Sequence, residues 1–345
     1  MRKSSPKSWK EGEVMKRVLF IVIDQLPGHW AEGVTVEGDI PPVNVWGYHK
    51  LGLIPTFSHL IESGLFAFCW NRGVCDTAHG MKYLATGTYD CGPFWSPRGG
   101  QPYYPREGRD SGPMGLFEFA KHYDPDGICS ACFTTDYWAA PGYFFTASDT
   151  YAFSAYFPDE RMWREFALPY LRKRENWNLV HIYFPLMDSV SFCPSYQKPA
   201  PHPRSSKHAY MMFLDSLLSE VVEFLLSSGL WDETLLVLAS DHGYHAACSV
   251  ARKMGATTPN WCCDHPGPYD CEVWDFESDR PKGIYSGGPR RTLLLLSGGA
   301  LPEGLRGKTV KEAEIIDVAP TIADFLGIPF ECQGKSLFLR LREEG

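Results

Sequence analysis

The segment "DETLLVLASDHGYH" (residues 232–245) indicates most clearly how this chain folds. Its apolar run is continuous rather than alternating, which is typical of a parallel strand that is covered on both faces. The run ends just before Asp241, and His242 follows directly. Because ligands in open parallel sheets bind beyond the carboxyl ends of the strands, we expect Asp241 and His242 to lie at a functional edge.

Two other segments repeat this arrangement. "RVLFIVIDQ" (17–25) is a second continuous apolar run and ends at Asp24, and "NLVHIYFPLMDSV" (178–190) is a third, with Asp188 just beyond it. The carboxyl ends of neighbouring parallel strands share one edge of a sheet. The three acids can therefore converge although they are far apart in the sequence.

Helical segments alternate with these strands. "IPTFSHLIESG" (54–64) and "HAYMMFLDSLLSEVVEFLLSSGLW" (208–231) place apolar residues at helical spacing and close at a glycine. "TLLLLSGG" (292–299) predicts another buried strand, and "EIIDVAPTIADFLGI" (314–328) a strand or turn that leads into a helix. The alternation predicts an α/β fold, a three-layer sandwich with a mostly parallel central sheet.

Two regions do not fit this alternation. Residues 91–160 are rich in Gly, Pro and aromatic residues, and residues 246–285 carry Cys, Trp and Pro without periodicity. We expect both to be loop-rich insertions over the sheet edge, where substrate-binding loops usually lie. The predicted organisation is a flexible basic tail over 1–15 and one α/β domain over 16–345.

The composition limits the classes of partner. With 33 basic and 41 acidic residues the net charge is −8, which argues against a nucleic-acid surface. An anionic substrate would then need a local positive centre, such as a metal. The apolar run after the tail is too short for a signal peptide or a membrane span, so we expect a cytoplasmic protein with no membrane contact. No feature of the sequence indicates the oligomeric state.

The eleven cysteines form no compact disulfide framework. Cys129 and Cys132 make a C-x-x-C pair, and Cys262 and Cys263 precede Asp264 and His265. These patterns leave two interpretations open, a structural zinc site or ordinary buried and loop thiols.

The strand-end residues suggest a metal site. Asp24, Asp241 and His242 supply two hard oxygens and an imidazole, a set suited to zinc, manganese or iron, although a strand-end Asp is often only a cap. In "VCDTAHGMKYLATGTYD" (74–90), Thr77 stands at a helix start, where free N–H groups attract anions. Metal coordination is one of the few ways to activate a threonine hydroxyl, and a plain helix N-cap is the alternative role for Thr77.

Taken in order, these segments resemble the alkaline phosphatase superfamily, especially its sulfatases, phosphonate monoester hydrolases and nucleotide pyrophosphatase/phosphodiesterases. The resemblance covers most of residues 17–340 and includes "TAHGMKYLATGTYD", which is similar to the nucleophile helix of that family. It implies an alkaline-phosphatase-like fold and a metal-dependent hydrolase. It also implies that Thr77 is the nucleophile and forms a covalent intermediate.

The sequence departs from the family pattern at two histidines. Where the two-metal branch has D-x-x-G-H, residues 188–192 read D-S-V-S-F, and Ser286 precedes the Gly-Gly that usually follows a histidine. The resemblance therefore implies one divalent ion, zinc or manganese, and leaves open both a second ion and the role of Asp188. The ligands it implies are Asp24, Thr77, Asp241 and His242.

The resemblance also suggests residues that contact the substrate. Lys282 is similar to a sulfatase lysine that contacts the transferring oxyanion or protonates the leaving group, and a solvated surface lysine is the alternative. Gln25 adjoins the first ligand, and His79 and His245 are close in sequence to Thr77 and His242, so each can bind substrate or supply a proton. One further imidazole is expected near Asp188, from His181, His202 or His208.

These expectations lead to a hydrolase of phosphate or phosphonate esters that acts on a small anionic substrate. Sulfatases mature a Cys or Ser to formylglycine within C-x-P-x-R, whereas residues 77–81 read T-A-H-G-M. Because this motif is missing, a sulfatase-like hydrolase is only the alternative. A phosphotransferase or mutase of the same superfamily is another. From a different class, the chain could be a degenerate member that binds a ligand without turnover.

Overall fold

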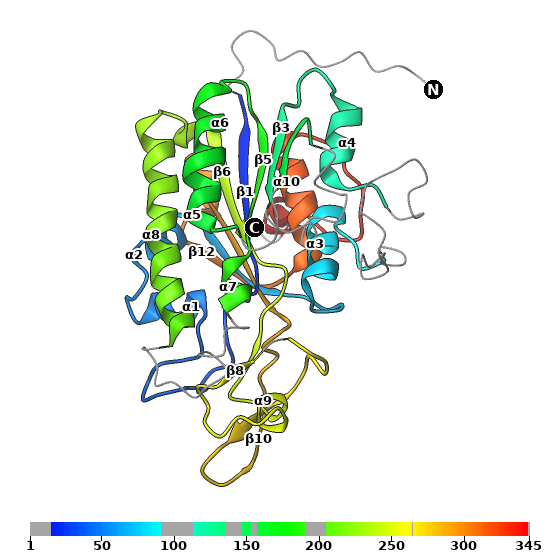
Figure 1. The fold of residues 1–345 in the computed structure, drawn as a ribbon. Helices are drawn as coiled ribbons and strands as arrows, with labels where there is room; N and C mark the ends of the chain where they lie inside the picture. The colour runs from blue at the N-terminus through cyan, green and yellow to red at the C-terminus, as the bar shows by residue number, and fades with distance from the viewer. Residues whose placement is uncertain are drawn as a thin grey trace.

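An eight-stranded sheet runs through the middle of the molecule (Figure 1). The computed structural model describes residues 15–90, 113–134, 147–152, 157–190, 205–263 and 265–343. The strand order is β12-β2-β11-β6-β1-β5-β3-β4, and β11 is the strand that runs antiparallel to both of its neighbours. The strands are β1 (Arg17–Ile23), β2 (Leu65–Trp70), β3 (Ser130–Thr134), β4 (Asp149–Ala152), β5 (Leu179–Phe184), β6 (Thr234–Ala239), β11 (Arg291–Ser297) and β12 (Lys308–Glu314). The expected α/β fold with a mostly parallel sheet is confirmed.

The centre of the sheet consists of the three strands whose apolar runs stop at an acid. β1 lies between β6 and β5 and pairs with both in parallel, with Val18 opposite Leu179 on one side and Leu235 on the other. All three strands are buried along their whole length. Their carboxyl ends therefore meet at one edge, as expected from the sequence.

Helices cover both faces of the sheet (Figure 1). Side chains alternate along β1, so Leu19, Ile21 and Ile23 enter one core with the first helix group, and Val18 and Phe20 enter the other core. The first group is α1 (Val45–Lys50), α2 (Pro55–Ser63), α5 (Asp159–Arg161) with the π-helix Met162–Ala167, α6 (Leu168–Lys173), α7 (Leu186–Ser189) and α8 (Ser206–Ser227). The second group is α3 (Thr77–Thr86), α4 (Leu116–Tyr123), α10 (Val318–Leu326) and α11 (Leu337–Glu343).

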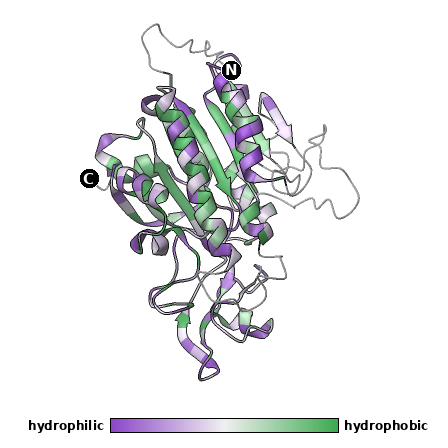
Figure 2. Ribbon diagram, turned by 60° about the vertical axis from the view of Figure 1, so that its left-hand side comes forward, coloured by the Kyte–Doolittle hydropathy of each residue, from purple (hydrophilic) through white to green (hydrophobic). Residues whose placement is uncertain are grey.

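Hydropathy follows this layering. Figure 2 shows mainly hydrophobic strands between helices that carry both hydrophobic and hydrophilic residues. In the described part of the chain, no helix is long and apolar enough to cross a lipid bilayer.

Part of the first expected insertion belongs to the main body. Within 91–160, the described residues contribute α4 and the strands β3 and β4, and β3 pairs in parallel with β5. The five residues of β3 read "SACFT" and are all buried, yet they contain no branched apolar side chain, so the hydrophobic run that revealed the central strands is absent. The prediction of an insertion over the whole of 91–160 is therefore wrong for this part.

The second expected insertion, 246–285, extends from the lower end of the molecule in Figure 1. It contains α9 (Ser249–Lys253), a two-stranded pair of β7 (His245–Ala246) with β8 (Cys262–Cys263), and a hairpin of β9 (Glu272–Asp275) with β10 (Arg280–Tyr285). All six residues of β10 are exposed. Ala246, Ala247 and Val273 of this segment join the main core, whereas β10 lies outside it.

Candidate active site

Three carboxylates lie at the carboxyl edge of the central strands. Asp24 directly follows β1, Asp241 lies two residues beyond β6, and Asp188 lies in α7, just after β5. Asp24 and Asp241 are buried, with 3% and 0% of their surface exposed. With His242 they form a group whose possible metal-ligating atoms all lie within 4.8 Å of one another.

His242 directs one nitrogen at these acids. Its Nδ1 is 2.9 Å from the carbonyl oxygen of Gly243, and a carbonyl can only accept, so Nδ1 carries the proton. Its Nε2 then has a lone pair and lies 3.3 Å from Asp24 Oδ1 and 3.5 Å from Asp241 Oδ2. A backbone hydrogen bond that fixes the tautomer in this way is usual for a metal-ligating histidine.

The charges in this group call for a cation. Burial, together with the charges of Asp241 and Asp188, raises the pKa of Asp24 well above its usual value. Asp24 Oδ1 and Asp241 Oδ2 are buried and accept no hydrogen bond from the residues that the structure describes. Burial lowers the pKa of His242 to about 4, so its imidazole is neutral at pH 7, as a ligand must be. Two carboxylates and a neutral imidazole fit a divalent transition-metal ion.

Thr77 is the first residue of α3, and the cap of that helix is Asp76. The Asp76 carboxylate accepts a hydrogen bond from the backbone N–H of His79 at 2.8 Å. Thr77 is therefore not the N-cap, and its Oγ1 lies 3.2 Å from His242 Nε2. The structure thus places the hydroxyl beside the nitrogen that faces Asp24 and Asp241.

Gly80 permits this approach. A Cβ atom at Gly80 would lie 2.4 Å from the backbone oxygen of Asp241 and 2.7 Å from its Cβ. The helix that carries Thr77 thus packs directly on the backbone of a candidate ligand, which only glycine allows.

A second group of possible ligands adjoins the first and shares His242 with it. It consists of Asp188, His242 and His265, again with the atoms within 4.8 Å of one another. His265 Nε2 is 3.9 Å from Asp188 Oδ1, and the two imidazole rings are 4.0 Å apart between centroids. The sequence drew attention to His265 only as a neighbour of two cysteines, because it comes from the insertion, where no strand pattern or motif marks it.

Gln25 connects the two groups. Its φ of 58° is in the left-handed region, which is unusual for a residue other than glycine and is often found at functional sites. Its backbone N–H donates to Asp241 Oδ1 at 3.1 Å, and its side-chain amide donates to Asp188 Oδ1. Its Oε1 accepts a hydrogen bond from Lys207 Nζ at 2.6 Å.

Lys207 brings a buried positive charge to this region. It is 2% exposed, donates to the carbonyl oxygen of Met187 at 3.1 Å and lies over the Tyr244 ring at 4.2 Å. Lys207 was not among the residues expected at the site. Its sequence position gave one indication. A lysine in the first turn of α8 interacts unfavourably with the helix dipole, which suggests that another interaction stabilises it there.

The sequence matches no protein-family model and no curated protein. Several solved structures do match. A phosphonate monoester hydrolase from Silicibacter pomeroyi has a TM-score of 0.58 at 13% identity, over 96% of this chain and 77% of that one. A protein in the alkaline phosphatase superfamily from Vibrio parahaemolyticus has 0.57 at 12%, over 94% and 70%. The chain has the alkaline phosphatase fold.

A third match is murine ectonucleotide pyrophosphatase/phosphodiesterase 5. It was solved as an inactive variant, with a threonine replaced by alanine, in complex with AMP. Its TM-score is 0.59 at 12% identity, over 95% of this chain and 99% of that one. At such identities the matches describe the fold of the chain and not its reaction.

Two of the residues expected at the substrate lie elsewhere in this alkaline phosphatase fold. Lys282 is on the exposed strand β10, where its charge helps to lower the pKa of Asp275 after the hydrogen bonds from Ser278. His181 is fully buried in the middle of β5, 5.2 Å from the Phe20 ring and 6.3 Å from the Phe117 ring. His181 is therefore a core residue, because its strand position is remote from the carboxyl edge.

The other expected histidines have separate surroundings. His79 Nδ1 lies 2.8 Å from Asp76 Oδ1, and His208 Nδ1 lies 3.2 Å from the hydroxyl oxygen of Tyr48. His245 belongs to a third group, with two cysteines. His265 supplies an imidazole near Asp188, and neither His181 nor His208 belongs to a metal-ligating group among the residues that the structure describes. His202, Ser191 and Phe192 lie outside the described residues.

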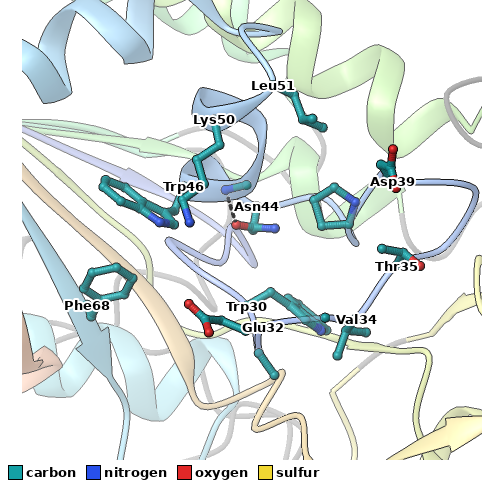
Figure 3. A pocket seen from close by; sticks show the side chains of 14 residues that line it. Trp30, Glu32, Val34, Thr35, Asp39, Asn44, Trp46, Lys50, Leu51 and Phe68 are labelled. Atoms are coloured by element: carbon teal, nitrogen blue, oxygen red, sulfur yellow. Dashed lines mark hydrogen bonds between the residues drawn. The ribbon is translucent and has the colours of Figure 1, made fainter.

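A cavity of about 370 Å³ lies beside this edge of the alkaline phosphatase fold. Figure 3 shows Trp30, Trp46, Phe68 and Lys50 among the side chains that line it. None of the residues of the two metal-ligating groups lines it. The Tyr244 ring contacts both the cavity and the site. Its centroid lies 5.2 Å from that of the Trp30 ring, and Lys207 Nζ lies over its face.

Proposed function

We propose that the protein is a metal-dependent hydrolase of phosphate or phosphonate esters, a member of the alkaline phosphatase superfamily, with Thr77 as its nucleophile. One observation carries this proposal: the Thr77 hydroxyl lies 3.2 Å from His242 Nε2, the atom that also faces Asp24 and Asp241. A hydroxyl at a helix N-terminus, beside two buried carboxylates and an imidazole, is suited to attack an anionic ester.

Asp24, Asp241, His242 and Thr77 would hold one divalent ion, zinc or manganese. When bound, such an ion lowers the pKa of a hydroxyl and neutralises anionic oxygens. His242 is a poor base for Thr77, because its pKa is about 4 and it would have to give up its role as a ligand. The Thr77 proton is therefore released to solvent.

Two displacements complete the reaction. Thr77 Oγ1 forms a bond to phosphorus while the bond from phosphorus to the leaving oxygen breaks, and that oxygen takes a proton from solvent. Water then attacks the phosphorus, the bond to Thr77 breaks, and the threonine recovers its proton. The N–H groups of Thr77 and Ala78, which do not donate to Asp76 as those of His79 and Gly80 do, orient the anionic oxygens in both steps.

The balance of charge favours a substrate with one negative charge. Asp24, Asp188 and Asp241 carry three negative charges when ionised, and Lys207 and one divalent ion add three positive charges. Despite its burial, Asp76 has a pKa that hydrogen bonds from His79 hold below its usual value, and it adds a further negative charge that acts on His242. The loaded site therefore has no excess positive charge, and such a site holds a phosphodiester or a phosphonate monoester better than a dianionic phosphate monoester. Lys207 supplies the positive charge that the sequence suggested for Lys282. It acts on the site through its hydrogen bond to Gln25 Oε1.

A sulfatase route has less support. Cys75 is the thiol nearest to Thr77 in the sequence, but it is fully buried, and burial raises its pKa to about 12. Its thiol is 3.7 Å from the carbonyl oxygens of Asn71 and Gly73. It is therefore not placed to serve as the precursor of a formylglycine.

The test is turnover of p-nitrophenyl esters by the full chain with each divalent metal in turn. The panel contains bis(p-nitrophenyl) phosphate, p-nitrophenyl phenylphosphonate, p-nitrophenyl phosphate and p-nitrophenyl sulfate. We expect the first two to be preferred, and Thr77→Ala to lose about 10³-fold or more in kcat. Thr88→Ala is the matched control, because Thr88 lies just beyond the same helix and bonds to Gln333.

A second comparison separates the two lysines. Lys207→Met should lower kcat/KM for the diester by at least tenfold, whereas Lys282→Met should leave it unchanged. No turnover of any ester with any metal, or full activity in Thr77→Ala, would show that the proposal is incorrect.

A further inference from the structure

A third cluster of possible ligands lies in the second insertion, apart from the carboxylates. It consists of His245 in β7, Cys248 at the start of α9 and Cys271 just before β9, all buried. His245 Nδ1 is 3.4 Å from Cys248 Sγ and 3.3 Å from Cys271 Sγ. Residues 26 positions apart along the chain are thus brought together around one nitrogen.

The tautomer of His245 suits a ligand. Its Nε2 is 2.7 Å from the carbonyl oxygen of Pro266, which can only accept, so Nε2 carries the proton. Nδ1 therefore has a lone pair, directed at both sulfurs. A hydrogen bond from the other ring nitrogen to a carbonyl is the usual way in which a protein orients a zinc-binding histidine.

The spacing of these atoms fits a tetrahedral ion. With zinc–sulfur bonds of about 2.3 Å and zinc–nitrogen bonds of about 2.0 Å, tetrahedral geometry puts a sulfur and a nitrogen about 3.5 Å apart. The two distances from Nδ1, 3.4 and 3.3 Å, are close to this value. The Ser286 hydroxyl lies 3.0 Å from Cys271 Sγ and can donate a hydrogen bond to a thiolate there.

The insertion has only a small apolar core of its own. Its own apolar core has five buried residues, and Cys248 and Cys271 are two of them. Segments with so small a core usually need a metal or a disulfide to hold a fixed structure. A single ion at this cluster would join β7, α9 and the β9–β10 hairpin.

We infer that His245, Cys248 and Cys271 bind a structural zinc ion that holds β7, α9 and the β9–β10 hairpin of the second insertion together. The thiolate ligands distinguish this site from the candidate active site, whose acids favour harder ions. The His245–Cys248–Cys271 cluster shares no residue with the two groups that contain Asp24, Asp188 and Asp241, so the zinc site does not depend on the proposed function. It also gives His245 a role other than contact with substrate.

The C-x-x-C pair noted in the sequence does not form such a site. Cys132 is buried in the apolar core on β3, and neither it nor Cys129 belongs to any metal-ligating group among the described residues.

Metal analysis and cobalt substitution of the full chain test the inference. We expect one zinc per chain that survives dialysis against EDTA and is released by p-hydroxymercuribenzoate. The protein reconstituted with Co²⁺ should show thiolate-to-cobalt charge-transfer absorption in the near ultraviolet. Cys248→Ser and Cys271→Ser should each lose that absorption, whereas Cys129→Ser and the active-site variant Asp241→Asn should retain it.

X-ray absorption on the unmodified zinc protein does not depend on how the variants fold. It should show sulfur neighbours at about 2.3 Å. Zinc with oxygen and nitrogen neighbours alone would overturn the inference. A disulfide between Cys248 and Cys271, detected by mass spectrometry of the alkylated protein, would also overturn it, as would retention of the cobalt absorption in both cysteine variants.

Discussion

The contact between Gly80 and Asp241 leads to a quantitative prediction for Gly80→Ala. The added Cβ would start 2.4 Å from the Asp241 carbonyl oxygen, and real Cβ atoms essentially never come closer than 3.0 Å. The helix or the Asp241 segment must therefore move by 0.6 Å or more. Forced packing of this kind typically costs about 1–3 kcal/mol of stability.

This cost competes with an intrinsic gain. Alanine is better than glycine in a helix by about 1 kcal/mol, so Gly80→Ala alone would understate the strain. Gly304→Ala is the control for the change from glycine to alanine, because Gly304 lies in the short 3-10 helix Glu303–Leu305 and a Cβ there meets nothing within 4 Å. We expect the free energy of unfolding of Gly80→Ala to be about 1–3 kcal/mol lower than that of the control, measured by urea unfolding.

The same displacement should reach the chemistry, because α3 carries Thr77. A misplacement of about 1 Å can cost about 10²-fold in rate, so we expect Gly80→Ala to lose at least about tenfold in kcat with the preferred ester. Gly304→Ala should keep native activity. If Gly80→Ala matches the control in both stability and activity, the close packing of α3 on Asp241 is not what positions Thr77.

Two further predictions concern buried titratable groups. Burial lowers the pKa of His181 to about 3 in the folded protein. Between about pH 6.5 and about pH 3, the unfolded chain therefore binds a proton at this histidine that the folded chain does not. The free energy of unfolding should fall by up to about 1.4 kcal/mol for each pH unit of acidification in this range. His181→Leu should remove this part of the slope in urea unfolding between pH 7 and pH 4, and an identical slope in both proteins would contradict the role of His181 as a neutral core residue. Asp24 has a raised pKa, so without metal its contribution to stability is present at low pH and is lost as the pH rises through that pKa. Asp24→Asn should therefore be more stable than the native chain in EDTA at pH 7 but less stable with saturating metal, and a variant that is less stable under both conditions would refute this.

The sequence predicted the central strands and the acids at their ends for a clear physical reason. Strands buried on both faces must be apolar throughout, so β1, β5 and β6 stand out, and the first polar residue after each marks the edge. Parallel pairing then brings Asp24, Asp188 and Asp241 together whatever the length of the connections.

The rest of the site depends on contacts that have no local pattern. His265 comes from an insertion without periodicity, and Lys207 reaches Gln25 from the first turn of α8, at a separation of 182 residues. His265 therefore could not be found from spacing. His181, a histidine close to Asp188 in the sequence, is buried in the core instead. Likewise, β3 was missed because its small side chains resemble those of a loop.

The tautomer of His242 limits how many ions the site can hold. Gly243 accepts the proton on Nδ1, so His242 offers a single lone pair, on Nε2, although it belongs to both metal-ligating groups. One lone pair can serve only one ion at a time. An ion bound beside Asp24 and Asp241 would leave Asp188 and His265 as the members of the other group that the structure describes and that do not ligate that ion. With this tautomer, the two groups compete for the Nε2 of His242.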